Sequence, residues 1–293
     1  MAMVGVAQRS AASSRMPRGG PVELTGRGAP YVRRLPGPPG SMTVVLLHGL
    51  GGSADLTWTP SYRALARCFS VVALDLRGHG RGIPHEGGPY RLEDCADDVA
   101  SLVAVLGVGP VLVVGYSMGG VVAQLLWQRH PATVAGLVLC STAADFRLPP
   151  HERMMVAALL TTGAVLRMVP PLFRVGFDTA SSLLVGHLDD PTREWARGDF
   201  GRCGFDTTLA AAMAVAGFSS RSWITGVDVP TAVVLTGQDR VVPPARQREL
   251  ADLIPGSAVH EIDAGHGACL SATAQFLPAF LAACRGVAAR RMT

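Results

Sequence analysis

Residues 111–120 read VLVVGYSMGG, and this stretch decides the fold. Its first four residues form a branched apolar run of strand length, and a helix-like segment follows over 118–129. A serine at a sharp turn from a strand into a helix takes a strained backbone conformation that projects its hydroxyl away from the sheet. The residues two before and two after it then lie close together and must be small, as Gly115 and Gly119 are. The stretch therefore predicts a nucleophilic serine, Ser117; the alternative is a glycine-rich turn with a capping serine.

Further apolar runs of strand length lie on both sides of this stretch. They are Thr43–Leu47, Val71–Leu74, Val134–Leu139, Ala232–Leu235 and Ala258–Ile262. Each has the length and composition of a strand that is buried on both faces of a parallel sheet. Helix-like segments alternate with these runs, at 58–68, 92–106, 118–129 and 243–254. The alternation predicts an α/β fold with a doubly wound, mostly parallel sheet.

Two parts of the chain depart from this alternation. Residues 1–41 are rich in glycine, proline, serine and arginine, and we expect a flexible arm with a short edge strand near Tyr31–Leu35. From 143 to 225 the sequence contains no strand-like run, and we expect a helical insert between two strands of the core. The helical pieces of this insert are expected at 151–168, 172–185, 191–200 and 206–217. The core is then made of residues 42–142 and 226–293.

The composition indicates a folded protein and excludes several kinds of chemistry. The chain has 293 residues, of which 48% are hydrophobic and 16% charged, whereas disordered chains combine low hydrophobicity with high charge. All 26 basic residues are arginine, and the chain contains neither lysine nor asparagine. Without lysine there is no Schiff base and no lysine-containing phosphate loop. Without asparagine there is no N-glycan and no Cys-His-Asn triad.

The net charge of +4 is unevenly distributed along the chain. Residues 1–42 hold six arginines and one glutamate, so the basic excess belongs to the arm and the rest of the chain is close to neutral. This distribution predicts no basic surface for nucleic acid. No apolar run approaches the roughly 18 residues of a membrane-spanning helix, so we expect no stable insertion into a membrane.

The six cysteines show no pattern of a metal site or of a redox pair. They are Cys68, Cys95, Cys140, Cys203, Cys269 and Cys284. None forms a Cys-x-x-Cys pair or groups with histidine at the spacing of metal ligands. We expect small buried side chains in a reducing compartment. The first 20 residues lack the continuous apolar stretch of a signal peptide, so we expect a cytoplasmic location.

A serine nucleophile needs a base and a carboxylate that orients this base. Asp239 ends the stretch LTGQD over 235–239, directly after a predicted strand, where the sites of α/β folds gather. His266 lies in DAGHG over 263–267, after the next predicted strand. Asp263 remains a rival acid, although a carboxylate three residues from the histidine on the same loop usually bonds the backbone.

The loop HGLGG over 48–52 follows the predicted strand Thr43–Leu47. Such a loop can present a free backbone N–H toward the nucleophile. We expect the N–H groups of Leu50 and Met118 to form an oxyanion hole, which holds the negative oxygen of a tetrahedral intermediate. His48 and Gly49 begin this loop.

These motifs together resemble those of the α/β-hydrolase family in its capped, single-domain form. The resemblance covers about residues 42–286. The loop at 48–52 matches the family's His-Gly loop, and the stretch at 115–119 matches its nucleophile elbow. The segment DLRGHG at 75–80 matches the turn after the family's second parallel strand.

The resemblance also implies roles for single residues. Ser117 would be the nucleophile, His266 the base and Asp239 the acid of a catalytic triad. Residues 143–225 would correspond to the family's cap, which covers the site and shapes the substrate pocket. His48 would be a structural residue that holds the oxyanion loop.

The activity implied by the resemblance is that of a serine hydrolase with an acyl-enzyme intermediate. We expect hydrolysis of a carboxylic ester of a small molecule, and the methionine and leucine content of the insert predicts an apolar acyl or alcohol group. A serine at the elbow excludes relatives with an aspartate nucleophile, such as epoxide hydrolases. A thioesterase, a carbon–carbon bond hydrolase, a perhydrolase of the same fold, or a small-ligand-binding protein with little catalysis remain alternatives. No cofactor and no metal are expected, and the oligomeric state is not predicted.

Overall fold

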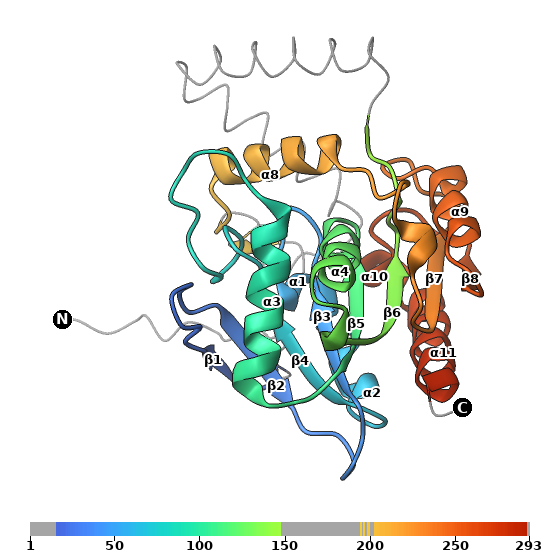
Figure 1. Cartoon of the computed structure of the whole chain (residues 1–293), viewed down its shortest axis with the longest axis horizontal. Coiled ribbons are helices and arrows are strands. Elements are labelled where there is room, and N and C mark those ends of the chain that lie inside the picture. Colours follow the sequence, from blue (N-terminus) through green and yellow to red (C-terminus); the bar gives the residue numbers. More distant parts are fainter. Residues whose placement is uncertain (1–15, 148–193, 195, 197, 200–201, 292–293) are drawn as a thin grey trace, which may run out of the picture.

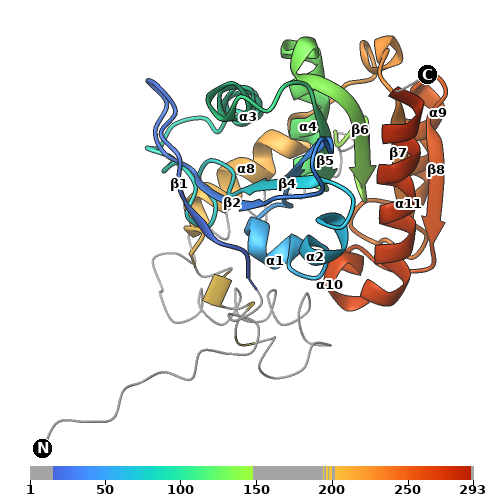
Figure 2. The ribbon, with the colours of Figure 1, turned by 90° about the horizontal axis from the view of Figure 1, so that it is seen from below.

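An eight-stranded sheet lies between two layers of helices in the computed structural model (Figures 1 and 2). The structure describes residues 16–147, 194, 196, 198–199 and 202–291. The strands are β1 Gly19–Pro21, β2 Tyr31–Leu35, β3 Thr43–Leu47, β4 Ser70–Leu74, β5 Val111–Tyr116, β6 Val134–Cys140, β7 Thr231–Thr236 and β8 Ala258–Ile262. Their order across the sheet is β1-β2-β4-β3-β5-β6-β7-β8.

The six strands from β4 to β8 in this order run parallel, and β1 and β2 add an antiparallel edge. In the centre of the sheet, Val113 of β5 lies opposite Val45 of β3 and Leu137 of β6. Every residue of β3, β5, β6 and β7 is buried, because helices cover both faces. The predicted doubly wound, mostly parallel α/β sheet is therefore confirmed.

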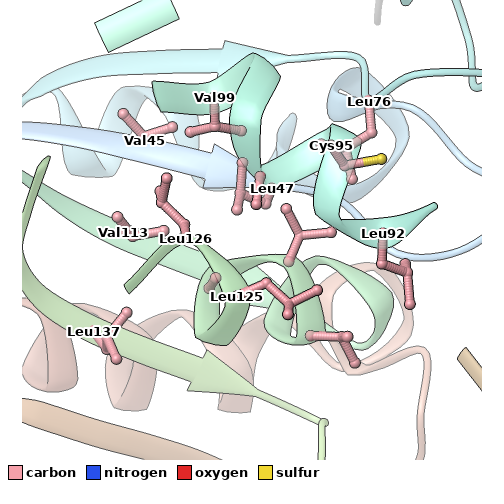
Figure 3. Close-up of a cluster of buried hydrophobic side chains, with 14 of the residues drawn as sticks. Val45, Leu47, Leu76, Leu92, Cys95, Val99, Val113, Leu125, Leu126 and Leu137 are labelled. Atoms are coloured by element: carbon pink, nitrogen blue, oxygen red, sulfur yellow. The ribbon is translucent and has the colours of Figure 1, made fainter. Parts of the chain in front are cut away.

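The helices divide between the two faces of the sheet (Figure 2). Their bounds are α1 Ala54–Trp58, α2 Tyr62–Leu65, α3 Leu92–Leu106, α4 Met118–Arg129, α8 Phe205–Gly217, α9 Pro244–Leu253, α10 Ala268–Ser271 and α11 Thr273–Arg291. Side chains of α3 and α4 pack with Val45, Leu47 and Val113 in one buried cluster (Figure 3), to which α9 adds Leu250. Side chains of α1, α2, α10 and α11 pack with Val44 and Leu46 in the other. Neighbouring strand residues thus serve opposite faces, as the period of a strand requires.

The helix expected over 58–68 is wrong in its bounds. Two short helices, α1 and α2, occupy this part of the chain instead. The hydroxyl of Ser53 caps α1 by accepting a hydrogen bond of 3.1 Å from the N–H of Leu56. Pro60 lies between the two helices and cannot donate the backbone hydrogen bond that a continuous helix needs.

Residues 16–41 take part in the sheet and its ion pairs, whereas we expected a flexible arm there. The expected edge strand is β2, which pairs with both β1 and β4. Arg33 in this strand donates two hydrogen bonds, of 2.8 and 2.6 Å, to the carboxylate of Asp55. Arg27 contacts Asp98 at 2.6 Å. Two N-terminal arginines therefore neutralise buried carboxylates of the core, which explains why this segment is ordered; residues 1–15 lie outside the described part.

The segment between β6 and β7 begins and ends at neighbouring points of the core. Asp145 and Ser219 form an antiparallel bridge, and the N–H of Phe146 donates to the carbonyl of Phe218 at 3.0 Å. The piece expected at 206–217 is the helix α8, which crosses the carboxyl ends of the central strands (Figure 1). The pieces expected at 151–168 and 172–185 lie outside the described residues. Of the piece at 191–200, residues 194, 196, 198 and 199 are described, and they are helical.

Candidate active site

Ser117 occupies the sharp turn between β5 and α4 with a backbone φ of 53° and ψ of −117°. A positive φ is uncommon for a residue that is not glycine, and it marks local strain. A Cβ on Gly115 would lie 2.2 Å from the carbonyl oxygen of Gly119, and a Cβ on Gly119 would lie 2.3 Å from the carbonyl oxygen of Leu47. Both glycines are therefore needed because backbone atoms fill the space on either side of the turn.

The structure brings Ser117, His266 and Asp239 into one hydrogen-bonded chain. Nε2 of His266 lies 3.0 Å from Oγ of Ser117, and Nδ1 lies 2.8 Å from Oδ2 of Asp239. Because the carboxylate accepts hydrogen bonds, we assign the ring proton to Nδ1, which leaves the Nε2 lone pair for the hydroxyl of the serine. The side chain of His266 is 18% exposed, whereas that of Asp239 is fully buried. In this geometry the imidazole of His266 can take the proton of the serine, and the carboxylate of Asp239 stabilises the positive charge that the ring then carries.

The carboxylate of Asp239 accepts an unusually large number of hydrogen bonds. Oδ1 accepts from the N–H groups of Val241 at 2.8 Å and Val242 at 2.9 Å. Oδ2 accepts from Thr236 Oγ1 at 2.8 Å and Gln247 Nε2 at 3.1 Å, in addition to the bond from the histidine ring. Burial alone would raise the pKa of Asp239, but these donors together hold it below its usual value. The group is therefore a carboxylate at neutral pH.

The rival acid Asp263 is not placed against the histidine. Its Oδ1 accepts a hydrogen bond of 2.9 Å from Nε2 of Gln238 at an exposed position. Asp263 lies on the same loop as His266, but the contact of the ring nitrogen is with Asp239.

The loop after β3 lies directly against the turn that holds the serine. A Cβ on Gly49 would lie 3.6 Å from the Cβ of Ser117. Within the described part of the chain, the backbone N–H groups of Leu50 and Met118 donate to no other group. These two expected oxyanion donors are therefore free to bind an oxygen.

His48 anchors this loop from a fully buried position. Its Nε2 accepts a hydrogen bond of 2.9 Å from the N–H of Leu76, and its Nδ1–H donates to the carbonyl of Gly49 at 2.7 Å. Burial lowers the pKa of His48, against the opposing effect of the nearby Asp75. The ring is therefore neutral, and both of its nitrogens are occupied by the backbone. This arrangement agrees with a structural role.

The comparisons with known proteins agree on one family. The family model described as alpha/beta hydrolase fold matches residues 43–273. The chain belongs to the α/β-hydrolase family. It is 28% identical over 237 residues to a poly(3-hydroxyalkanoate) depolymerase of Ectopseudomonas oleovorans, a match that covers 79% of this chain and 80% of the relative.

Solved structures of α/β hydrolases superpose well on this chain. A thermophilic esterase of Thermogutta terrifontis gives a TM-score of 0.74 at 25% identity, and the match covers 92% of this chain and 99% of the esterase chain. An enol-lactonase of Burkholderia xenovorans LB400 gives a TM-score of 0.71 at 24% identity, with 90% and 98% of the two chains covered. The likeness to the lactonase shows the fold, and together these matches identify the protein as a hydrolase of the α/β fold family.

A cavity of about 240 Å³ opens beside Ser117 and His266 in this hydrolase. Its other walls are mostly apolar and come from the loop after β3, from α1, from α10 and from the loop after β7. They include Leu50, Leu56, Thr57, Val241, Cys269 and Leu270. No aspartate, glutamate or arginine belongs to the lining that the structure describes.

Two residues of the site were missed by the sequence analysis. The hydroxyl of Tyr116 donates to the backbone carbonyl of His266 at 2.5 Å, and Gln247 binds the carboxylate of Asp239. The sequence around Gln247 shows no clear signal, because this residue lies between Arg246 and Arg248. The structure shows that its side chain and that of Leu250, three positions further along α9, are fully buried. A glutamine on the apolar face of a helix indicates a polar partner inside the protein.

Within the described ranges, no group of three or more His, Cys, Asp or Glu side chains is arranged to hold a metal ion. The six cysteines are free thiols, and five of them are buried. Among the residues that the structure describes, we find no helix with the length and apolarity needed to cross a membrane.

Proposed function

We propose that this protein hydrolyses carboxylic esters of small apolar molecules, with Ser117 as nucleophile, His266 as general base and Asp239 as the acid of the triad. The contact chain from Oγ of Ser117 through the imidazole to the carboxylate of Asp239 carries this proposal. Groups of this kind at these distances activate a hydroxyl for attack on a carbonyl carbon.

The first half of the reaction forms the acyl-enzyme. Oγ of Ser117 attacks the carbonyl carbon of the ester while its proton passes to Nε2 of His266. The carbonyl oxygen becomes negative and accepts hydrogen bonds from the N–H groups of Leu50 and Met118, and one such donor typically contributes about 10²–10³ in rate. The tetrahedral species then expels the alcohol, which takes the proton from His266.

The second half repeats these steps with water as the nucleophile. A water molecule gives one proton to Nε2 of His266 and attacks the acyl carbon. Collapse of the second tetrahedral species releases the carboxylic acid and returns the proton to Oγ of Ser117. Throughout, the negative charge of Asp239 favours the imidazolium form that each transfer creates.

The choice of an apolar ester rests on the cavity and on two similar proteins. The walls beside Ser117 are formed by leucine, valine, cysteine and threonine side chains, without a charged residue in the described lining. A relative named a poly(3-hydroxyalkanoate) depolymerase and a similar structure named an esterase favour the ester class. The insert at 143–225 would act as a cap, since it joins β6 to β7 at the end of the sheet where Ser117 lies.

Two experiments test this proposal. A fluorophosphonate probe should label the wild-type protein and leave the Ser117→Ala variant unlabelled, because the probe reacts with an activated serine. Wild-type protein that stays unlabelled, or a variant that labels equally, would refute the serine nucleophile. A panel of chromogenic esters from acetate to long chains should show higher kcat/KM for apolar acyl groups, and equal or better rates on small polar esters would refute the substrate class.

A further inference from the structure

A buried polar cluster contacts Asp239, and none of its residues belongs to the described lining of the cavity beside Ser117. It consists of Gln247 on α9, Thr236 at the end of β7 and Ser141 directly after β6. All three residues have no exposed surface. Burying an amide and two hydroxyls carries a free-energy cost unless each finds a partner, so their presence among apolar strands and helices requires an explanation.

Gln247 uses its whole side-chain amide within this cluster. Its Oε1 accepts from the N–H of Thr236 at 3.1 Å, and its Nε2 donates to the carbonyl of Val242 at 2.7 Å. The second Nε2 proton faces two acceptors, Thr236 Oγ1 at 2.9 Å and Asp239 Oδ2 at 3.1 Å. The amide therefore holds the strand end, the following loop and the carboxylate in one fixed arrangement.

Thr236 extends the same arrangement to the carboxylate. Its hydroxyl has one proton, and the shortest acceptor is Oδ2 of Asp239 at 2.8 Å. Its oxygen can then accept from Gln247, and it lies 3.2 Å from Oγ of Ser141. Ser141 reaches this position through a left-handed backbone with φ of 48°. A chain of hydrogen bonds thus runs from Ser141 through Thr236 to Oδ2 of Asp239, the same oxygen that contacts Nδ1 of His266.

We propose that Gln247 is a positioning residue of the triad, which acts on the histidine by holding Asp239, directly and through Thr236, in the rotamer that meets Nδ1 of His266. This inference rests on the proposed function. A methionine of similar length would fill the same space on α9, so packing alone does not demand an amide at this position. The amide is explained because a carboxylate that carries catalytic charge must stay oriented without help from water.

The first test is the Gln247→Met variant, with Gln124→Met as its matched control. Gln124 is equally buried and donates to the carbonyl of Ala143 at 3.1 Å, but none of its hydrogen bonds involves the triad. We expect Gln247→Met to lower kcat for a chromogenic ester about 10- to 100-fold with KM changed less than about twofold, the size of one lost hydrogen bond to a charged group. Gln124→Met should keep kcat. Equal effects of both variants on kcat would overturn the inference.

A double-mutant cycle separates positioning from a structural effect. In the Asp239→Asn background the carboxylate is gone, so adding Gln247→Met should change kcat and the rate of fluorophosphonate labelling by less than about twofold. A further loss as large as the loss in the wild-type background would show that Gln247 does not act through Asp239.

A second pair of variants covers the case in which Gln247→Met does not fold. Thr236→Val removes the hydroxyl at constant shape, and Thr236→Ser keeps it. We expect a lower kcat for the valine variant and a near-normal kcat for the serine variant; equal values would contradict the inference. The outcomes also distinguish the two proposals. Wild-type protein that the fluorophosphonate probe does not label would refute the serine mechanism. Wild-type protein that is labelled and active, together with Gln247 and Thr236 variants of unchanged kcat, would refute the positioning role alone.

Discussion

The nucleophile turn allows no methyl group at Gly115. A Cβ there would lie 2.2 Å from the carbonyl oxygen of Gly119, 2.5 Å from its carbonyl carbon and 2.6 Å from Cα of Gly120. All three are backbone atoms, so the clash of more than about 1 Å cannot be relieved by a rotamer change. Overpacking typically costs about 1–3 kcal/mol, and we expect Gly115→Ala to lose about 3 kcal/mol or more in the free energy of unfolding.

The same substitution should impair the chemistry. A shift of Ser117 by about 1 Å is enough to reduce a rate about 100-fold, so fluorophosphonate labelling of Gly115→Ala should slow by about this factor. Urea unfolding followed by tryptophan fluorescence measures the stability of the same samples. A variant within about 1 kcal/mol of wild type that labels at the wild-type rate would refute the steric argument.

Gly286→Ala is a matched control for this experiment. Gly286 lies in α11, and a Cβ there would meet no heavy atom within 4 Å. Because alanine is favoured over glycine inside a helix, we expect a gain of about 0.5–1 kcal/mol and an unchanged labelling rate. The two glycine substitutions should therefore change the free energy of unfolding in opposite directions.

Three further predictions concern buried polar groups. Tyr116→Phe removes the donor to the backbone carbonyl of His266 and should lower both kcat and the free energy of unfolding, the latter by about 1–2 kcal/mol in urea titrations. Burial, followed by the effect of the nearby His48, lowers the pKa of His79 from 6.5 to about 4. Stability that is present above pH 6.5 should therefore be lost as the pH falls toward 4. The free energy of unfolding, measured by urea titrations across that range, should fall by about 3 kcal/mol. Arg33→Met takes one partner from the buried carboxylate of Asp55, which keeps Arg81, and should cost about 2 kcal/mol in the free energy of unfolding at pH 7, measured by thermal unfolding.

Neighbouring residues provide controls for two of these predictions. Arg34 is exposed, so Arg34→Met should change the unfolding temperature little, and a loss equal to that of Arg33→Met would contradict the role of the ion pair. His85 is only partly buried, so His85→Gln should keep the acid sensitivity that His79→Gln reduces. Identical pH profiles of the two histidine variants would contradict the assignment to His79.

The sequence predicted the sheet well because each central strand is buried on both faces. A run such as Val111–Val114 has no alternation and so indicates helices above and below it. The serine turn was equally readable, since Gly115 and Gly119 are required by local geometry. Asp239 and His266 follow strands that end at the same edge, so their meeting with Ser117 was expected from these positions together with the family resemblance. The distances of the structure show that the ring of His266 contacts Asp239 and not Asp263.

Contacts between distant segments were harder to predict. Arg33 looked like part of a solvated basic arm because its partner, Asp55, is 22 residues away and on another element. Gln247 stands between two arginines in a polar helix, so its local sequence resembles a surface. The partners of Arg33 and Gln247 depend on how the sheet and the helices pack. The sequence neighbours of these two residues do not reveal this packing.

The antiparallel bridge between Asp145 and Ser219 brings both ends of a long segment together. The length of that segment therefore does not set the distance between the ends of β6 and β7. An insertion or deletion between these two points should therefore leave the pairing of β6 with β7 in place. With the cap role proposed for residues 143–225, the choice of substrate and the chemistry would be carried by separate parts of the chain, and the first could change while Ser117 stays in place.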